Sequence, residues 1–216
     1  MKNKIIKILI SVILVTAAVF SVTSCDRKYN EEEVLEAAKA LIEDSKKFNL
    51  IYWGEGIPYV RDESSSNGYY YPANPIEVKK MGFETVEELK EITGEVFSES
   101  YCKSIFSSAL SSYGDEDGIY GLTRYYQKYS DAYMTEPECI MVYSRATVFL
   151  TDEVEYLYDT MVVTGSKKET VYVKLSVNVT RDDKTQTREM KVGLCEEASG
   201  WRLDTPTYIT YYEEQN

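Results

Sequence analysis

The 216-residue chain contains no histidine, and this absence excludes several kinds of active site. Serine hydrolases and cysteine peptidases activate their nucleophile with a histidine base, so Ser-His-Asp and Cys-His sites are excluded. Zinc sites of the hydrolase kind, which bind their metal through histidine, are excluded too. Cysteine is also scarce. Besides Cys25, only Cys102, Cys139 and Cys195 occur, far apart and without the close spacing of a metal or redox motif.

The scarcity of these residues leaves no metal or cofactor site to predict. In an oxidising compartment two of the three distant cysteines could form a disulfide, and buried free thiols fit the sequence equally well. Paired carboxylates for glycoside hydrolysis remain open as well, because 36 acidic residues make close pairs inevitable. No particular pair stands out, so we interpret the protein as non-enzymatic.

The first 25 residues have the features of an export signal. Three lysines precede an apolar run over residues 8–20, and small residues lead from it to Cys25. The run is too short to span a bilayer, for which a helix needs about 20 residues. Val22-Thr23-Ser24-Cys25 resembles the lipobox of bacterial lipoproteins, which implies cleavage before Cys25 and acyl chains such as palmitate on that residue. The alternative is an ordinary secretory signal that happens to contain a cysteine.

We therefore predict a lipoprotein signal peptide over residues 1–24 and a short tether over residues 25–30. The mature protein is expected on the extracytoplasmic face of a cell membrane, held there by the lipid on Cys25. Several acyl chains bind a bilayer far more firmly than one. Residues 31–216 are long enough for a single domain with its own core.

Acidic side chains outnumber basic ones by 36 to 24. The whole chain has a formal charge of −12, and residues 1–25 contribute +3 to it, so the remainder carries −15. Such a charge repels nucleic acid phosphates and anionic lipid headgroups. We expect no nucleic acid partner, and contact with the membrane only through the lipid.

Helical patterns occupy the first half of the mature chain. Asn30 with Glu33 is typical of a helix start, and the apolar spacing that follows predicts a helix over residues 31–49. Residues 50–82 are rich in glycine, serine, asparagine and proline, which predicts a loop with short strands on either side.

Two more helices are expected after this loop. Thr85-Val86-Glu87-Glu88 is a capping box, and apolar positions continue from it to Phe97. Ser98 is a suitable cap for the next helix, which a turn at residues 114–118 would end. Within that turn, Asp115-Glu116-Asp117 has too few ligands at fixed positions for an EF-type calcium site, so a solvated turn is expected.

Strand patterns occupy the second half of the chain. Aromatic, β-branched or alternating apolar residues predict strands over 120–129, 144–151, 159–164, 170–180, 186–196 and 201–204. Arg181-Asp182-Asp183-Lys184 is a polar hairpin turn between two of them. Helices first and an antiparallel meander afterwards indicate an α+β fold.

The C-terminal segment resembles a known fold. Gly200-Trp201-Arg202-Leu203-Asp204, followed by Pro206, is similar to the last strand of cystatin-like and NTF2-like domains. This resemblance implies N-terminal helices packed on one curved antiparallel β-sheet.

A second resemblance covers about half the chain and points to a function. The matching motifs after the first helix are Ile51-Tyr52-Trp53-Gly54-Glu55-Gly56, Tyr71-Pro72, Thr85-Val86-Glu87-Glu88-Leu89-Lys90 and Val96-Phe97-Ser98, extended by Leu122-Thr123-Arg124-Tyr125 and Tyr133-Met134. Together they resemble the IseA family of secreted inhibitors of peptidoglycan D,L-endopeptidases. The resemblance implies binding to a cysteine peptidase of the NlpC/P60 type rather than catalysis.

Four aromatic residues are the candidate partner-binding residues. Trp53 is either a hot spot of binding energy or part of the core, since tryptophan dominates both. Tyr69, Tyr70 and Tyr71 either contact a partner or begin a tyrosine-rich strand. The predicted partner is a cell-wall endopeptidase or another envelope protein. The alternative function is a membrane-tethered binding module for cell-wall glycan or another envelope protein.

Overall fold

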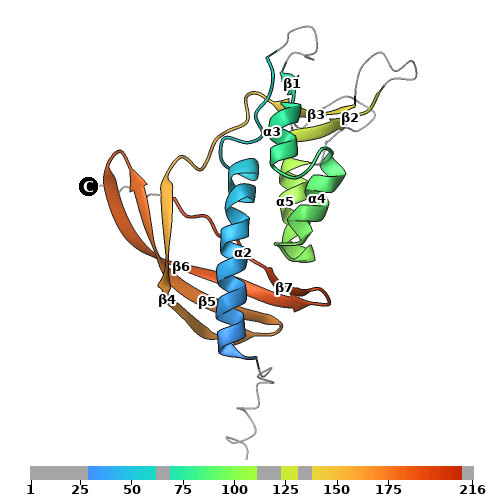
Figure 1. The fold of residues 1–216 in the computed structure, drawn as a ribbon. Coiled ribbons are helices and arrows are strands. Elements are labelled where there is room, and N and C mark those ends of the chain that lie inside the picture. The colour runs from blue at the N-terminus through green and yellow to red at the C-terminus, as the bar shows by residue number, and fades with distance from the viewer. Residues whose placement is uncertain (1–28, 62–68, 111–122, 131–137, 211–216) are drawn as a thin grey trace, which may run out of the picture. The chain divides into compact units, whose positions relative to one another are not determined.

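A computed structural model describes residues 29–61, 69–110, 123–130 and 138–210, and Glu31–Asn216 form one compact unit (Figure 1). Four helices lie in these ranges: α2 (Glu31–Tyr52), α3 (Pro75–Lys80), α4 (Val86–Gly94) and α5 (Glu99–Ala109). The strands there are β1 (Tyr70–Pro72), β2 (Tyr125–Lys128), β3 (Cys139–Tyr143), β4 (Glu153–Lys167), β5 (Thr170–Arg181), β6 (Lys184–Glu197) and β7 (Gly200–Leu203). The predicted α+β class is confirmed.

The strands form two antiparallel sheets, neither of which closes into a barrel. The larger sheet has the order β4-β5-β6-β7 and the smaller one the order β1-β3-β2. The sequence predicts one sheet, and this is wrong, because β3 pairs with β2 and with β1, which lies among the helices, and not with β4–β7. The cystatin/NTF2 comparison stays a prediction.

The core of the larger sheet lies along β5. Its alternate residues are all buried: Val171, Val173, Leu175, Val177 and Val179. Asp182 and Asp183 join β5 to β6 with φ values of 48° and 60°. Positive φ at both central residues is the twist that a two-residue hairpin requires. The predicted hairpin at residues 181–184 is therefore confirmed.

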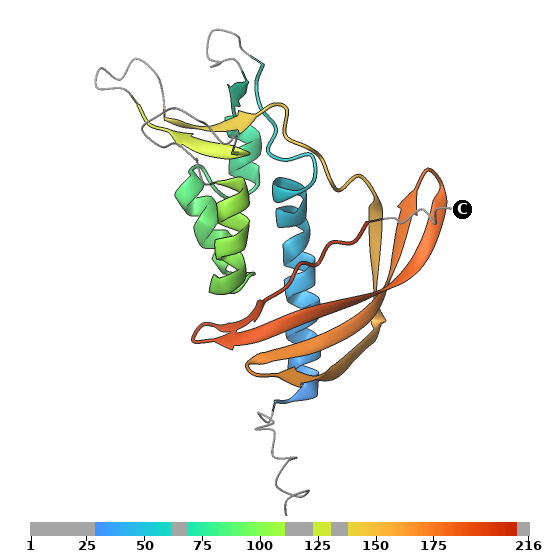
Figure 2. The same ribbon diagram turned by 180° about the vertical axis from the view of Figure 1, so that it is seen from behind.

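Helix α2 packs against this sheet (Figures 1 and 2). Its buried face includes Ser45, whose hydroxyl lies 2.6 Å from that of Thr207, and Asn49, whose amide donates to the same hydroxyl at 3.0 Å. The Thr207 carbonyl accepts from the Tyr156 hydroxyl of β4 at 3.0 Å. A buried threonine beyond β7 thus ties α2 to the opposite edge strand.

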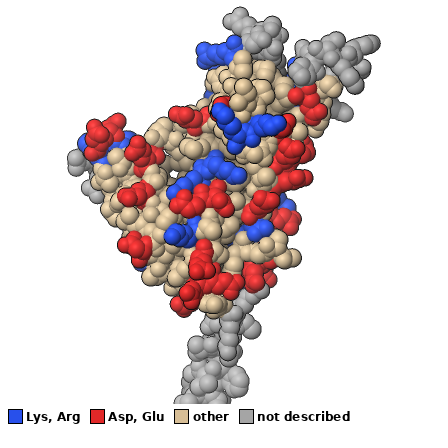
Figure 3. Space-filling view, in the orientation of Figure 1, with Lys and Arg blue, Asp and Glu red and all other residues tan. Residues whose placement is uncertain are grey.

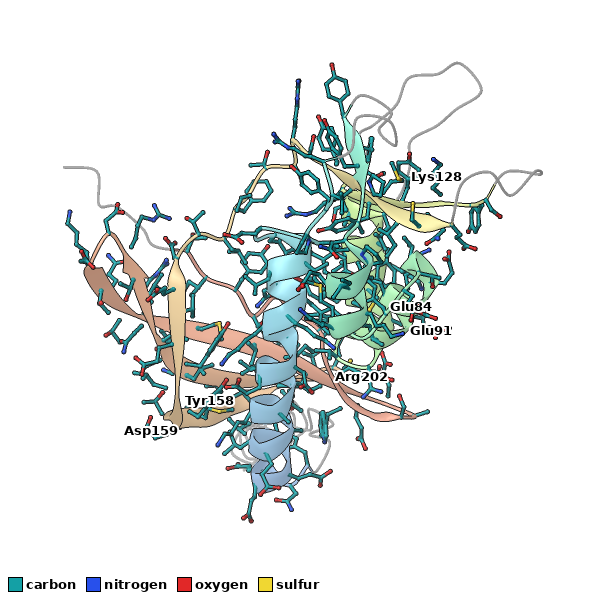
Figure 4. All side chains as sticks on the ribbon, turned by 45° about the horizontal axis from the view of Figure 1, so that its top comes forward. Glu84, Glu91, Lys128, Tyr158, Asp159 and Arg202 are labelled. Atoms are coloured by element: carbon teal, nitrogen blue, oxygen red, sulfur yellow. The ribbon has the colours of Figure 1, made fainter. Side chains whose placement is uncertain are left out.

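Cations from α2 also lie over tyrosine rings of β4. The Lys46 ammonium is 5.0 Å from the Tyr156 ring centre, and the Lys39 ammonium is 5.5 Å from that of Tyr158. Figure 4 shows Tyr158 beside the helix and Arg202 near α4. Arg202 of β7 donates to the Gly94 carbonyl at 2.9 Å, which attaches the end of α4 to the sheet.

Helix α4 ends at Gly94, earlier than its apolar pattern predicts. Val96 and Phe97 leave the helix because their segment hydrogen-bonds to the edge strand β7: the Leu203 amide donates to Val96, and the Ser98 amide donates to Leu203. The capping box at Thr85 and the cap at Ser98 are both confirmed.

Two further segments correct the sequence interpretation. Helix α3, begun by Asn74 and Pro75, occupies part of the predicted loop. Residues 144–151, predicted as a strand, form none, because their backbone bonds to the end of α2 and to a side chain instead of a ladder. No helix in the described ranges is long and apolar enough to cross a membrane. The three distant cysteines are free thiols.

Candidate functional site

A cavity of about 410 Å³ lies where the end of α2, β3 and the segment after β3 come together. Trp53, directly after α2, contributes to its wall and is half-buried rather than part of the core. Its ring also lies 4.7 Å from that of Tyr208, centre to centre. Of the two sequence interpretations of Trp53, the structure is compatible with a binding role, because its ring borders open space.

The tyrosine triplet is divided between two groups. Tyr70 lies 5.2 Å from Tyr143 between ring centres, and Tyr143 lines the cavity. Tyr71 instead stacks on Tyr59 at 5.4 Å. Successive side chains of a strand point to opposite faces, which separates Tyr70 from Tyr71. The sequence treats the triplet as one patch, whereas the structure places Tyr70 beside a cavity residue and Tyr71 in a separate pair.

Tyr69 lies beside the cavity, where the segment after β3 binds it. Its carbonyl accepts from the Ser144 amide at 2.9 Å and from the Ser144 hydroxyl at 2.8 Å. The Arg145 guanidinium lies 4.4 Å from the Tyr69 ring centre. Tyr69 is 45% exposed, so a stacked cation and ring face solvent at the rim.

We call Trp53, Tyr69, Tyr70, Tyr143, Arg145 and Phe149 the aromatic–arginine surface. Phe149 is 61% exposed, although it is a large apolar residue. Its amide and that of Leu150 both donate to the Trp53 carbonyl, at 2.8 and 3.1 Å. The end of α2 therefore fixes the segment that presents Phe149.

Arg124 lies beneath this surface and also lines the cavity. Its side chain donates to the carbonyls of Tyr52, Gly54 and Thr147 and to the Tyr125 hydroxyl. One buried cation thus joins the end of α2, the turn after it, β2 and the segment after β3.

A close backbone approach makes this arrangement possible. Gly56 has φ +85°, and a Cβ there would lie 2.8 Å from a terminal nitrogen of Arg124 and 2.6 Å from the Tyr125 hydroxyl. Any other residue at position 56 would be strained and would displace both groups. Gly56 therefore determines how closely the backbone can approach Arg124 and Tyr125.

The arginines supply the charge of the site, because its tyrosines are neutral. Burial raises the pKa of the Tyr52 and Tyr125 hydroxyls above the usual range. Tyr70 is less buried, and burial raises the pKa of its hydroxyl as well. These phenols are therefore neutral at physiological pH, whereas guanidinium groups stay charged. Figure 3 shows acidic side chains over much of one face, with basic side chains in small separate groups.

Other sequence-predicted features do not join this site. Cys25 and Asp115-Glu116-Asp117 lie outside the described residues. Within the described ranges, no group of three or more histidine, cysteine, aspartate or glutamate residues is placed to hold a metal ion.

The sequence does not predict Tyr143, Arg145 or Phe149 as site residues. Arg124 occurs in it only within the motif Leu122-Thr123-Arg124-Tyr125. One signal was present: Arg145 and Phe149 occur in an apolar stretch that lacks the strict alternation of a half-buried strand.

The chain was compared with models of protein families, with curated proteins and with solved structures. None of the three comparisons found a match.

Proposed function

We propose that this protein is a lipid-anchored, extracytoplasmic binding protein that inhibits or otherwise modulates a peptidoglycan D,L-endopeptidase of the NlpC/P60 type. The observation that supports a binding role is the aromatic–arginine surface. Tryptophan, tyrosine and arginine are the residues that most often dominate the energetics of protein interfaces. Here they gather at a cavity from segments far apart in the sequence.

The construction of this surface favours recognition over catalysis. Its polar groups of fixed charge are arginines, and its tyrosines are hydrogen-bonded or stacked into place; for example, the Tyr70 hydroxyl donates to the Thr123 carbonyl at 2.8 Å. Rigid aromatic groups lose little conformational entropy when they bind a partner. The surface therefore suits a preorganised contact with another macromolecule.

The strongly acidic remainder of the protein would assist the encounter. A charge of −15 steers a basic enzyme toward the inhibitor and raises the association rate. This attraction is screened by salt, because the Debye length is about 8 Å at physiological ionic strength. Anchoring through Cys25, with the tether over residues 25–30, would keep the inhibitor at the membrane beside enzymes that cut the wall.

The proposal is tested with purified residues 26–216, which contain the whole compact unit, and purified NlpC/P60 endopeptidases. Release of muropeptides from peptidoglycan should fall in a saturable way and recover at high salt. Undiminished cleavage at excess protein would reject the proposed function.

A matched pair of variants tests the proposed surface. Tyr69→Ala should weaken inhibition, whereas Tyr172→Ala should leave it unchanged. The two tyrosines are comparable because each has a cation over its ring, at 4.4 Å for Arg145 and 4.2 Å for Lys191. Equal loss in both variants would mean that stability, not the surface, was measured. For the anchor, Cys25→Ser should release the protein from membranes, as followed by fractionation and acyl labelling.

A further inference from the structure

Arg124 is a buried cation that has no opposing charge among the described residues. The residue is 8% exposed, and within the described ranges no carboxylate lies in ion-pair distance of its guanidinium. Buried charges are ordinarily paired, because removing an ion from water is costly. All four of its hydrogen bonds are to neutral oxygens. Its charge is therefore solvated by neutral oxygens, and no carboxylate of residues 29–61, 69–110, 123–130 or 138–210 compensates it.

The hydrogen bonds also leave one donor over. A guanidinium has five N–H groups. Nε and one of the terminal nitrogens use all of theirs, while the nitrogen that bonds to the Gly54 carbonyl keeps one N–H without an acceptor among the described residues. This spare donor lies beside Gly54 and Gly56, whereas the other terminal nitrogen bonds to Tyr52 and Thr147, which line the cavity. Arg124 itself contributes to the cavity wall, so a ligand there can contact its guanidinium and its charge.

Arg145 is a second cation at the same cavity, again without an acidic partner in the described part of the chain. It is exposed, lies over the Tyr69 ring, and forms no ion pair with any described carboxylate. None of the described residues that line the cavity is acidic. Glu55, the acid next to Gly54 in the sequence, is exposed and pairs with neither arginine. Two arginines at one cavity, with no acid among its described lining residues, are unexpected in a chain as acidic as this one.

The walls between these cations are aromatic. Trp53, Tyr143 and Phe149 border the cavity and offer flat, partly apolar faces. A phosphate or polyanion needs many donors, and the charge of the whole protein would repel it. A carboxylate needs only two or three donors and can be carried on an apolar body that the aromatic faces cover.

We propose that this cavity binds a peptide carboxylate, with the charge between Arg124 and Arg145 and the adjoining apolar side chain against Trp53, Tyr143 and Phe149. The proposal rests on the proposed function in one respect: it places a carboxylate of the partner or its peptide substrate at the aromatic–arginine surface. The carboxylate site can nevertheless be tested without any endopeptidase.

The test uses the emission of Trp53. The chain has two tryptophans, and Trp201 lies on β7, so Trp201→Phe leaves Trp53 as the sole reporter. The probes are N-acetyl-leucyl-leucine as the free acid and the same peptide as its C-terminal amide. The acid should shift the Trp53 emission in a saturable way, with the amide binding at least about tenfold more weakly because it lacks the charge-assisted hydrogen bonds.

Arg145 supplies the variant, because it is exposed and its loss should not prevent folding. Arg145→Gln should weaken binding of the acid by about tenfold and leave the amide unaffected. Lys191→Gln is the matched control: it also removes an exposed cation from a tyrosine ring, but on the larger sheet, and should change nothing. The proposal would be overturned if acid and amide bound equally, or if neither bound. It would also be overturned if inorganic phosphate bound the cavity more tightly than the peptide acid.

The carboxylate site and the proposed function fail in different ways. Acid-selective binding without endopeptidase inhibition would retain the site and reject the proposed function. Inhibition by a protein that binds acid and amide equally would retain the proposed function and reject the site.

Discussion

The hydroxyl of Tyr125 is the group whose removal should most clearly report how the cavity is held together. Tyr125 is fully buried on β2. Its hydroxyl donates to the Ile51 carbonyl at 2.6 Å and accepts from the Ile57 amide and from Arg124, both at 3.0 Å. Tyr125→Phe keeps the ring and removes only this junction.

The loss can be worked from the three groups left behind. The substitution leaves one amide, one carbonyl and one guanidinium N–H without this partner in a buried place. An unsatisfied buried polar group costs about 1–3 kcal/mol, and a charged one more. We therefore expect the free energy of unfolding to fall by about 3–6 kcal/mol, a large share of the roughly 5–15 kcal/mol typical of a domain.

Urea unfolding followed by circular dichroism measures this loss, with Tyr172→Phe as the control because its hydroxyl has no bond partner among the described residues. The control should change the free energy by less than about 0.5 kcal/mol. A loss below about 1 kcal/mol in Tyr125→Phe would show that water or local relaxation replaces the junction, and the reasoning about Arg124 would then need to be abandoned.

Three further predictions concern the scaffold. Ser98→Ala removes the cap of α5 and should lower the free energy of unfolding by about 1–2 kcal/mol in urea titrations. Leu175→Ala opens a cavity in the core of the larger sheet and should cost about 2–5 kcal/mol, with a lower Tm in calorimetry. Burial raises the pKa of the Cys102 and Cys195 thiols from 9.0 to about 11, so the folded state favours their neutral form. Their contribution to stability should be complete below about pH 9 and lost as the pH rises through 11. Replacing both by alanine should flatten that decline in urea titrations.

Elements set by local chemistry could be predicted from the sequence. Helix α2 starts at residue 31 as expected. It runs to Tyr52, three residues beyond the predicted end at 49, and Ile51 and Tyr52 are buried in this last part of the helix. The alternation of β5 and the hairpin after it were also predictable, since both depend on near neighbours in the chain.

Elements set by distant partners could not be predicted. Strand β3 forms because β1 and β2 pair with it on both sides, and the residues of Cys139–Tyr143 do not predict those pairings. For the same reason the apolar pattern of α4 predicts a helix that continues past Gly94, where the helix ends. The competing hydrogen bonds come from Leu203, more than a hundred residues away. In both cases tertiary contacts outweigh local propensity.

The candidate site divides in the same way. Trp53, Tyr69, Tyr70 and Tyr71 are predicted as candidates from residue type alone, because aromatic residues are prominent at binding surfaces. Arg145 and the buried Arg124 are recognisable only once the fold places them at one cavity, whose described lining residues include no acid.

The pairing of residues 96–98 with β7 has a consequence for self-association. An open strand edge can accept a strand from another molecule, which promotes aggregation. The linker between α4 and α5 covers the β7 edge with hydrogen bonds to Leu203, so β4 is the remaining edge of the larger sheet in the described ranges. The ladder of β4 shifts register between Leu157 and Val162, and such an irregularity interrupts the flat edge that another strand would need. Both edge strands of the larger sheet are thus protected against pairing with another molecule, β7 by the segment that covers it and β4 by its bulge.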